Sequence, residues 1–99
     1  MRLDRRLRGM TSAKLPGADL IEQGLIDLAS GSETIESLLV SIGAPRLRTL
    51  GYAVPALFEH PERRLYQLLA HQYGAGAHSR YNALVRQVVS FQRAAACAS

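Results

Sequence analysis

"DLIEQGLIDLASG", residues 19–31, is the stretch that decides the fold class. Its apolar residues recur at helical spacing and fall within about 140° of a helical wheel. They are Leu20, Ile21, Gly24, Leu25 and Leu28. Asp19 followed by Glu22 has the spacing of a capping box, and Gly31 is placed to end a helix. The stretch therefore predicts an amphipathic helix over residues 19–30.

The next segment repeats the pattern. "ETIESLLVSIG" predicts a helix over residues 33–42, with Ser32 as its cap and Gly43 at its end. Residues 45–50 then predict a short extra helical turn, because proline suits the first position of a helix and Gly51 closes the segment. A loop follows.

Two further helices are predicted in the second half, over residues 61–73 and 79–94, separated by the glycine-rich "GAGA". The inner face of the first is predicted to hold Leu65, Leu68, Leu69, Gln72 and Tyr73. We therefore expect an all-α fold, a small four-helix bundle-like single domain with a short extra helical turn.

Composition indicates a soluble, cytoplasmic protein. Hydrophobic residues make up 47% and charged residues 20% of the 99 residues, which is typical of a globular chain. No apolar run is long enough to cross a membrane, and we expect no secretory signal. Cys97 is the single cysteine, which excludes an internal disulfide and fits a reducing compartment.

The net charge of +4 is concentrated at the N-terminus. Residues 1–14 hold five basic residues and one acid, whereas the seven arginines and seven acids beyond them balance. We therefore divide the chain into a basic flexible arm, residues 1–17, and a helical domain, residues 18–99, and predict no basic face on the helical domain. The candidate nucleic-acid contacts are Arg2, Arg5, Arg6 and Arg8 in the arm, with Arg86 and Arg93 on the outer face of the last helix. A solvated terminus, or a start at Met10 that removes the four arginines, are the alternatives.

Several kinds of site are not predicted. The segment around Gly43 resembles the turn of a helix-turn-helix, but residues 45–50 are too short for a recognition helix. The three histidines lack metal-ligand spacing, and no second cysteine supports Cys97. We expect no metal, no cofactor and no small-molecule ligand.

"RRLYQLLAHQY", residues 63–73, is the stretch that suggests catalysis. Arg64 and His71 lie on one polar helical face, with their backbones about 10 Å apart. A histidine can transfer a proton while an arginine neutralises a phosphate, which is the chemistry that a metal-independent ribonuclease needs.

This stretch resembles the Arg-(four to six residues)-His motif of the HEPN ribonucleases, some of which end in His-x-Tyr, as His71 and Tyr73 do here. Leu65 departs from the family pattern, which has a polar residue after the arginine. The resemblance implies a small helical bundle, often a toxin paired with an antitoxin, in which Arg64, His71 and Tyr73 are catalytic. A solvated helix face explains the same residues.

Three functions therefore remain open. We favour a non-enzymatic, small helical interaction protein, adaptor or regulator, that forms a homodimer or binds a protein partner. It would fit a bacterial toxin–antitoxin or mobile-element system. Ile26 is the predicted interface residue, since it is apolar on the polar face of its helix. The alternatives are the ribonuclease and a nucleic-acid-associated protein that binds through its arm.

Overall fold

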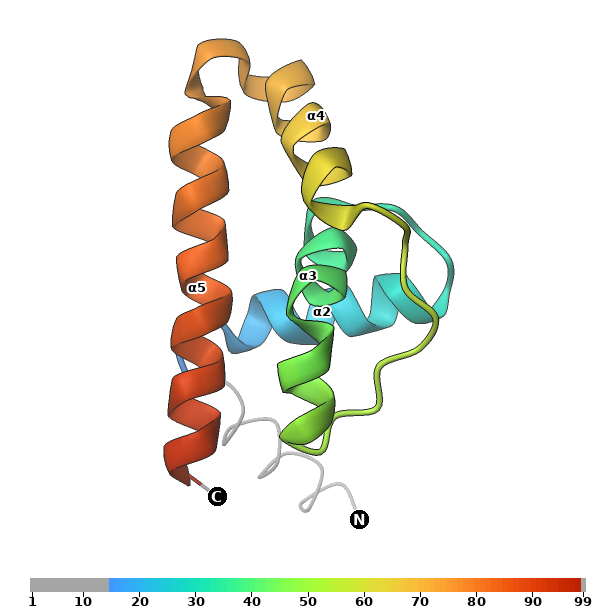
Figure 1. Cartoon of the computed structure of the whole chain (residues 1–99), viewed down its shortest axis with the longest axis vertical. Helices are drawn as coiled ribbons and strands as arrows, with labels where there is room; N and C mark the ends of the chain where they lie inside the picture. Colours follow the sequence, from blue (N-terminus) through green and yellow to red (C-terminus); the bar gives the residue numbers. More distant parts are fainter. Residues whose placement is uncertain (1–14, 99) are drawn as a thin grey trace.

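A computed structural model describes residues 15–98 of the chain. All regular structure in this part is helical, with no strand (Figure 1). The elements are α2 (Ala18–Ala29), α3 (Ile35–Thr49), α4 (Pro61–Tyr73), the 3-10 turn η1 (Gly74–Gly76) and α5 (Ala77–Ala98). The predicted all-α class is confirmed.

Helix α3 is the central element, because it packs against α2, α4 and α5. It runs beside α5 in the same direction, α4 runs back towards the start of α5, and α2 lies across the others (Figure 1). The predicted four-helix bundle is not confirmed, because α2 crosses its neighbours instead of running along them.

The core between these helices is apolar. Its largest fully buried side chains are Phe91, Ile21, Leu38, Leu39, Leu47, Leu65, Leu69 and Val40. Each buried residue of this size contributes about 1.5–3 kcal/mol. The apolar stripes predicted over residues 19–30 and 61–73 supply Ile21, Leu65 and Leu69, so these parts of the stripes face the core.

The predicted end of the second helix at Gly43 is wrong, and so is the separate helical turn over residues 45–50. Helix α3 continues through both Gly43 and Pro45 to Thr49. Gly43 lies against α5, where an added Cβ would come within 2.8 Å of Gln92 Nε2 and 2.9 Å of Val88 Cγ1. Glycine permits this close approach instead of ending the helix. Pro45 is tolerated because it is exposed, while Leu47, two residues later, is fully buried.

Two predicted helix starts are also corrected. Gly17, with φ of 80°, precedes α2, so Asp19 lies in its first turn and is not its cap. Thr34, not Ser32, caps α3: its Oγ1 accepts from Ser37 N at 3.0 Å, and Ser37 Oγ accepts from Thr34 N at 2.8 Å. This reciprocal pair is a capping box. Both corrections have one cause, since the cap depends on where the chain turns and not on residue type alone.

Two of the predicted helix ends are confirmed. The carbonyl of Asp27 accepts from Ser32 N at 2.8 Å, and that of Leu47 accepts from Tyr52 N at 3.0 Å. Each pair spans a glycine with positive φ, Gly31 at 77° and Gly51 at 101°. These are Schellman motifs, in which glycine adopts the left-handed conformation at low cost.

The predicted inner face of α4 is right for its leucines and wrong at its end. Leu65 and Leu69 are fully buried and Leu68 is half-buried, whereas Gln72 and Tyr73 are exposed. The last turn of α4 leads into η1, and the Tyr73 ring lies beneath the guanidinium of Arg80, 4.0 Å from ring centroid to Cζ.

Candidate functional site

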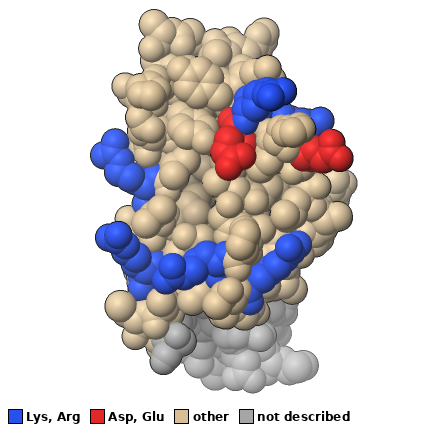
Figure 2. All heavy atoms as spheres, in the orientation of Figure 1, with Lys and Arg blue, Asp and Glu red and all other residues tan. Residues whose placement is uncertain are grey.

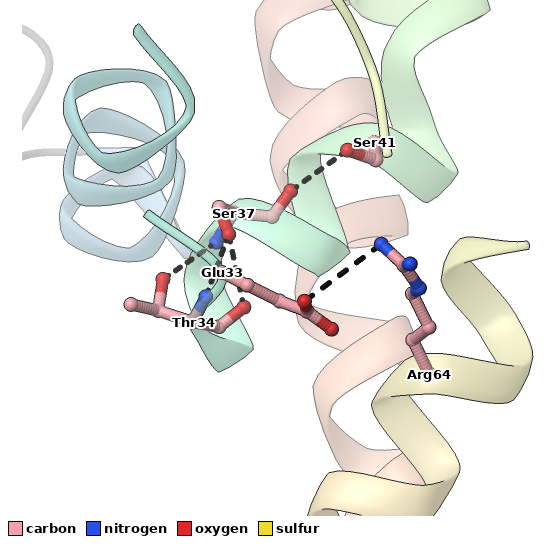
Figure 3. Close-up of polar contacts among 5 residues, drawn as sticks. All are labelled: Glu33, Thr34, Ser37, Ser41 and Arg64. Atoms are coloured by element: carbon pink, nitrogen blue, oxygen red, sulfur yellow. Dashed lines mark hydrogen bonds and ion pairs between the residues drawn. The ribbon is translucent and has the colours of Figure 1, made fainter. Parts of the chain in front are cut away.

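Arg64 lies in the first turn of α4 and points towards the start of α3 (Figure 3). Its Nη1 is 3.7 Å from Glu33 Oε1, and both side chains are nearly half exposed. The guanidinium also lies over the ring of Phe58, 5.8 Å from its centroid. An exposed ion pair of this kind contributes about 0–1 kcal/mol. Arg64 therefore helps to join α4 to α3.

The polar groups near Arg64 are satisfied by one another. Thr34 Oγ1 donates to Asp27 Oδ2 at 2.7 Å, and Ser41 Oγ donates to the carbonyl of Ser37 at 3.0 Å. Figure 3 shows Thr34, Ser37 and Ser41 along the first turns of α3. Within residues 15–98, no buried polar side-chain atom lacks a partner. This cluster caps α3 and leaves no unpaired buried group for chemistry.

His71 and Tyr73 lie at the other end of α4. His71 is exposed in its last turn, and Tyr73 stacks with Arg80. Two surface hollows, one beside α2 and one along α5, are lined by neither Arg64 nor His71. In the described part of one chain, Arg64 and Tyr73 thus have separate partners, and none of the three residues lines either of these two hollows. The catalytic assignment stays a prediction.

A strip of exposed and half-buried tyrosine and valine side chains lies on α4 and α5. We call it the tyrosine strip, and it consists of Tyr66, Tyr73, Tyr81, Val85 and Val89. The Tyr66 ring contacts Tyr81, with centroids 5.7 Å apart, and Tyr81, Val85 and Val89 follow at intervals of four residues along α5. Partial burial, and then the charge of Glu62, raise the pKa of Tyr81 above its usual value of 10.0. Sequence reasoning missed the strip because its members come from two helices.

The other predicted contact residues are placed as follows. Ile26 is the most exposed of the large hydrophobic side chains described, at 62%. Arg86 and Arg93 are exposed on α5. Arg2, Arg5, Arg6 and Arg8 lie outside the described residues.

The prediction of no basic face on the helical domain is wrong. Figure 2 shows a row of basic side chains across the lower part of the molecule, over the second halves of α3 and α5. Arg46 and Arg48 are the basic residues of α3, Arg93 is that of the second half of α5, and Arg86 lies just before the middle of α5. Charges that balance in the sequence are therefore separated in space.

Among residues 15–98, no group of three or more histidine, cysteine or acidic side chains is arranged to hold a metal ion. None of the described helices has the length and apolar character needed to cross a membrane. No family model, curated protein or solved structure matches the chain. Its function is therefore inferred from its own residues.

Proposed function

We propose that this chain is a small helical interaction protein that self-associates through the tyrosine strip. The observation that carries the proposal is the exposure of large apolar and aromatic side chains on α4 and α5. Tyr66, Tyr73 and Val89 are 41%, 42% and 38% exposed. Tyrosine and arginine are enriched at the centres of protein interfaces, where they lose little conformational entropy for the area that they bury.

A second copy of the chain is the proposed occupant. A strip built from two neighbouring helices presents a surface that can pair with itself around a two-fold axis. A chain of this length buries a limited share of its surface on folding, so pairing would also stabilise it. Arg80, held over Tyr73, places a cation beside the aromatic rings at one end of the strip.

Sedimentation velocity over the micromolar range tests this proposal. We expect the wild-type chain to be a dimer and Val89→Arg to be a monomer, because Val89 lies on the strip and a charge there would be buried against the partner. Ala53→Arg is the matched control, since it adds the same charge at an exposed loop position. Thermal unfolding of each variant verifies that its fold is intact.

Ile26→Arg decides between the two candidate interfaces. If the strip forms the interface, this change on α2 leaves the dimer intact. Dissociation by Ile26→Arg but not by Val89→Arg would move the interface to α2 and contradict the strip. A wild-type monomer at high concentration would contradict self-association altogether.

A further inference from the structure

The second halves of α3 and α5 carry the row of basic side chains seen in Figure 2. We define the arginine face by four exposed arginines of these two helices: Arg46, Arg48, Arg86 and Arg93. Arg86 and Arg93 are seven residues apart, so they lie on the same side of α5, with their backbones about 10 Å apart along the helix.

Close packing at Gly43 holds α3 and α5 side by side. Gln92 Nε2 donates to the carbonyl of Gly43 at 3.1 Å, and Val88 packs beside it. Because α3 and α5 run in the same direction past this contact (Figure 1), Arg46 lies three residues beyond Gly43 on α3, and Arg93 directly follows Gln92 on α5. The face therefore rests on a rigid two-helix platform.

No acidic residue lies on α5 or in the second half of α3. The five acids of residues 15–36 lie on α2 and at the start of α3, a segment that contains no lysine or arginine. Residues 37–98 hold seven arginines and two acids, Glu59 and Glu62, and both acids lie at the start of α4. The acidic side chains visible in Figure 2 lie apart from the row. The second half of α3 and the whole of α5 thus carry arginines and no acid.

The arginines of the face are available to a ligand. All four are exposed, and within residues 15–98 no side-chain hydrogen bond or ion pair engages Arg46, Arg86 or Arg93. Arg48 is oriented by the loop, since its Nη2 donates to the carbonyls of Val54 and Pro55 at 3.1 and 3.3 Å. Among residues 15–98, no carboxylate forms an ion pair with any of the four.

We propose that the arginine face binds the phosphate backbone of duplex DNA, independently of the self-association proposed above. Guanidinium groups bind phosphate oxygens, and a row of them on a rigid surface neutralises several phosphates at once. The exposed tyrosines, Tyr66 and Tyr73, lie on α4 and not in the row. Single-strand binding depends on aromatic stacking platforms, so their absence from the face favours a duplex. Backbone contacts alone predict binding without sequence preference.

Fluorescence anisotropy of the full chain with a labelled duplex DNA of mixed sequence tests this proposal. The variants are Arg46→Gln, Arg86→Gln and Arg93→Gln. Each is expected to weaken binding roughly threefold to tenfold and to lower the salt dependence of log K by about 0.9, as expected for one lost phosphate contact. Arg63→Gln is the matched control, because it removes one exposed arginine from α4, away from the face.

The control separates a specific surface from general charge. Wild-type affinity for Arg63→Gln, with losses at the other three positions, supports the proposal. Equal losses at all four positions would show that net charge alone drives binding, and so would overturn it. Vesicles containing phosphatidylserine form a second arm. Tighter, Arg86- and Arg93-dependent binding to vesicles than to DNA would assign the face to a membrane surface instead, and no binding to DNA at about 50 mM salt would end the proposal.

Discussion

Gly24 and Gly43 lie in the middle of helices, where glycine costs about 0.5–1 kcal/mol relative to alanine. The structure explains both by contact. A Cβ on Gly24 would overlap the backbone carbonyl of Glu36 and the Cγ2 of Val40, so α2 crosses α3 at this point. The same residue type ends helices at Gly31 and Gly51, where φ is positive. At the scale of one residue, the neighbours decide which role a glycine has.

Gly24→Ala should therefore destabilise the protein. Overpacking against a backbone carbonyl costs about 1–3 kcal/mol, and the better helix propensity of alanine returns about 1 kcal/mol. We expect a net loss of about 1–2 kcal/mol in the free energy of unfolding in urea. Gly76→Ala is the control, because its Cβ would have no neighbour closer than 3.9 Å and its φ is not positive. Equal stability of both variants would contradict a close crossing at Gly24.

Thr34 and Ser32 are both suitable capping residues, yet only Thr34 caps α3. Thr34→Ala removes the acceptor for Ser37 N and the hydrogen bond to Asp27 Oδ2, and should cost about 1–2 kcal/mol. Ser32→Ala, at an exposed position, should change the free energy of unfolding by less than about 0.5 kcal/mol. Thr34→Ser should restore most of the loss. A larger loss of stability in Ser32→Ala than in Thr34→Ala would show that Ser32, and not Thr34, caps α3.

At the scale of the element, α3 continues through a glycine and a proline that predict its end. Ala44 and Leu47 are fully buried, and Thr49 Oγ1 donates to the Pro45 carbonyl at 3.0 Å. Burial of these residues helps to offset the cost of about 3 kcal/mol for a proline inside a helix. The length of α3 in turn brings Arg46 and Arg48 beside α5.

Pro45→Ala discriminates between one helix and two. In a continuous α3, alanine restores an N–H that can donate to the Ser41 carbonyl, which stabilises the helix. Loss of proline also makes the unfolded chain more flexible, which opposes this gain, so the free energy of unfolding should rise by about 1–2 kcal/mol in total. If Pro45 began a separate helix, the same change would be neutral or destabilising, because proline suits the first position. Urea unfolding measures the difference.

At the scale of the whole molecule, Tyr52 joins three parts of the chain. It follows α3, its ring contacts Phe91 of α5 at a centroid distance of 5.6 Å, and the charge of Glu22 on α2 acts on its hydroxyl. Burial, and then that charge, raise the pKa of Tyr52 above its usual value of 10.0. The folded state therefore holds the proton more tightly than the unfolded state does.

This difference predicts a loss of stability at alkaline pH. The contribution of Tyr52 to the free energy of unfolding is fully present below about pH 10. It is lost as the pH rises from the pKa of tyrosine in the unfolded chain to the higher pKa in the folded protein. Tyr52→Phe cannot ionise, so its free energy of unfolding should fall less steeply above pH 10. Tyr81→Phe should act in the same direction, because the pKa of Tyr81 is also raised. If the free energy of unfolding of Tyr52→Phe fell as steeply above pH 10 as that of the wild type, the raised pKa of Tyr52 would be contradicted.

Local sequence patterns correctly predicted the helical class, the approximate ranges of α2, α4 and α5, and the helix ends at Gly31 and Gly51. These follow from local physics, since apolar spacing and backbone preference act within a few residues. The exposure of Ile26, Arg86 and Arg93 was also readable from single helices.

Tertiary structure alone decided which residues meet. The continuation of α3 depends on what its second half buries, and the pairing of Arg64 with Glu33 depends on where α4 begins relative to α3. The tyrosine strip and the arginine face each combine residues of two helices. The positive charges of the arginine face are matched in number by acids elsewhere in the sequence, so the count of charges did not predict the face. Contacts between distant segments depend on how the helices pack, and that packing is set by the whole core and not by any one stretch.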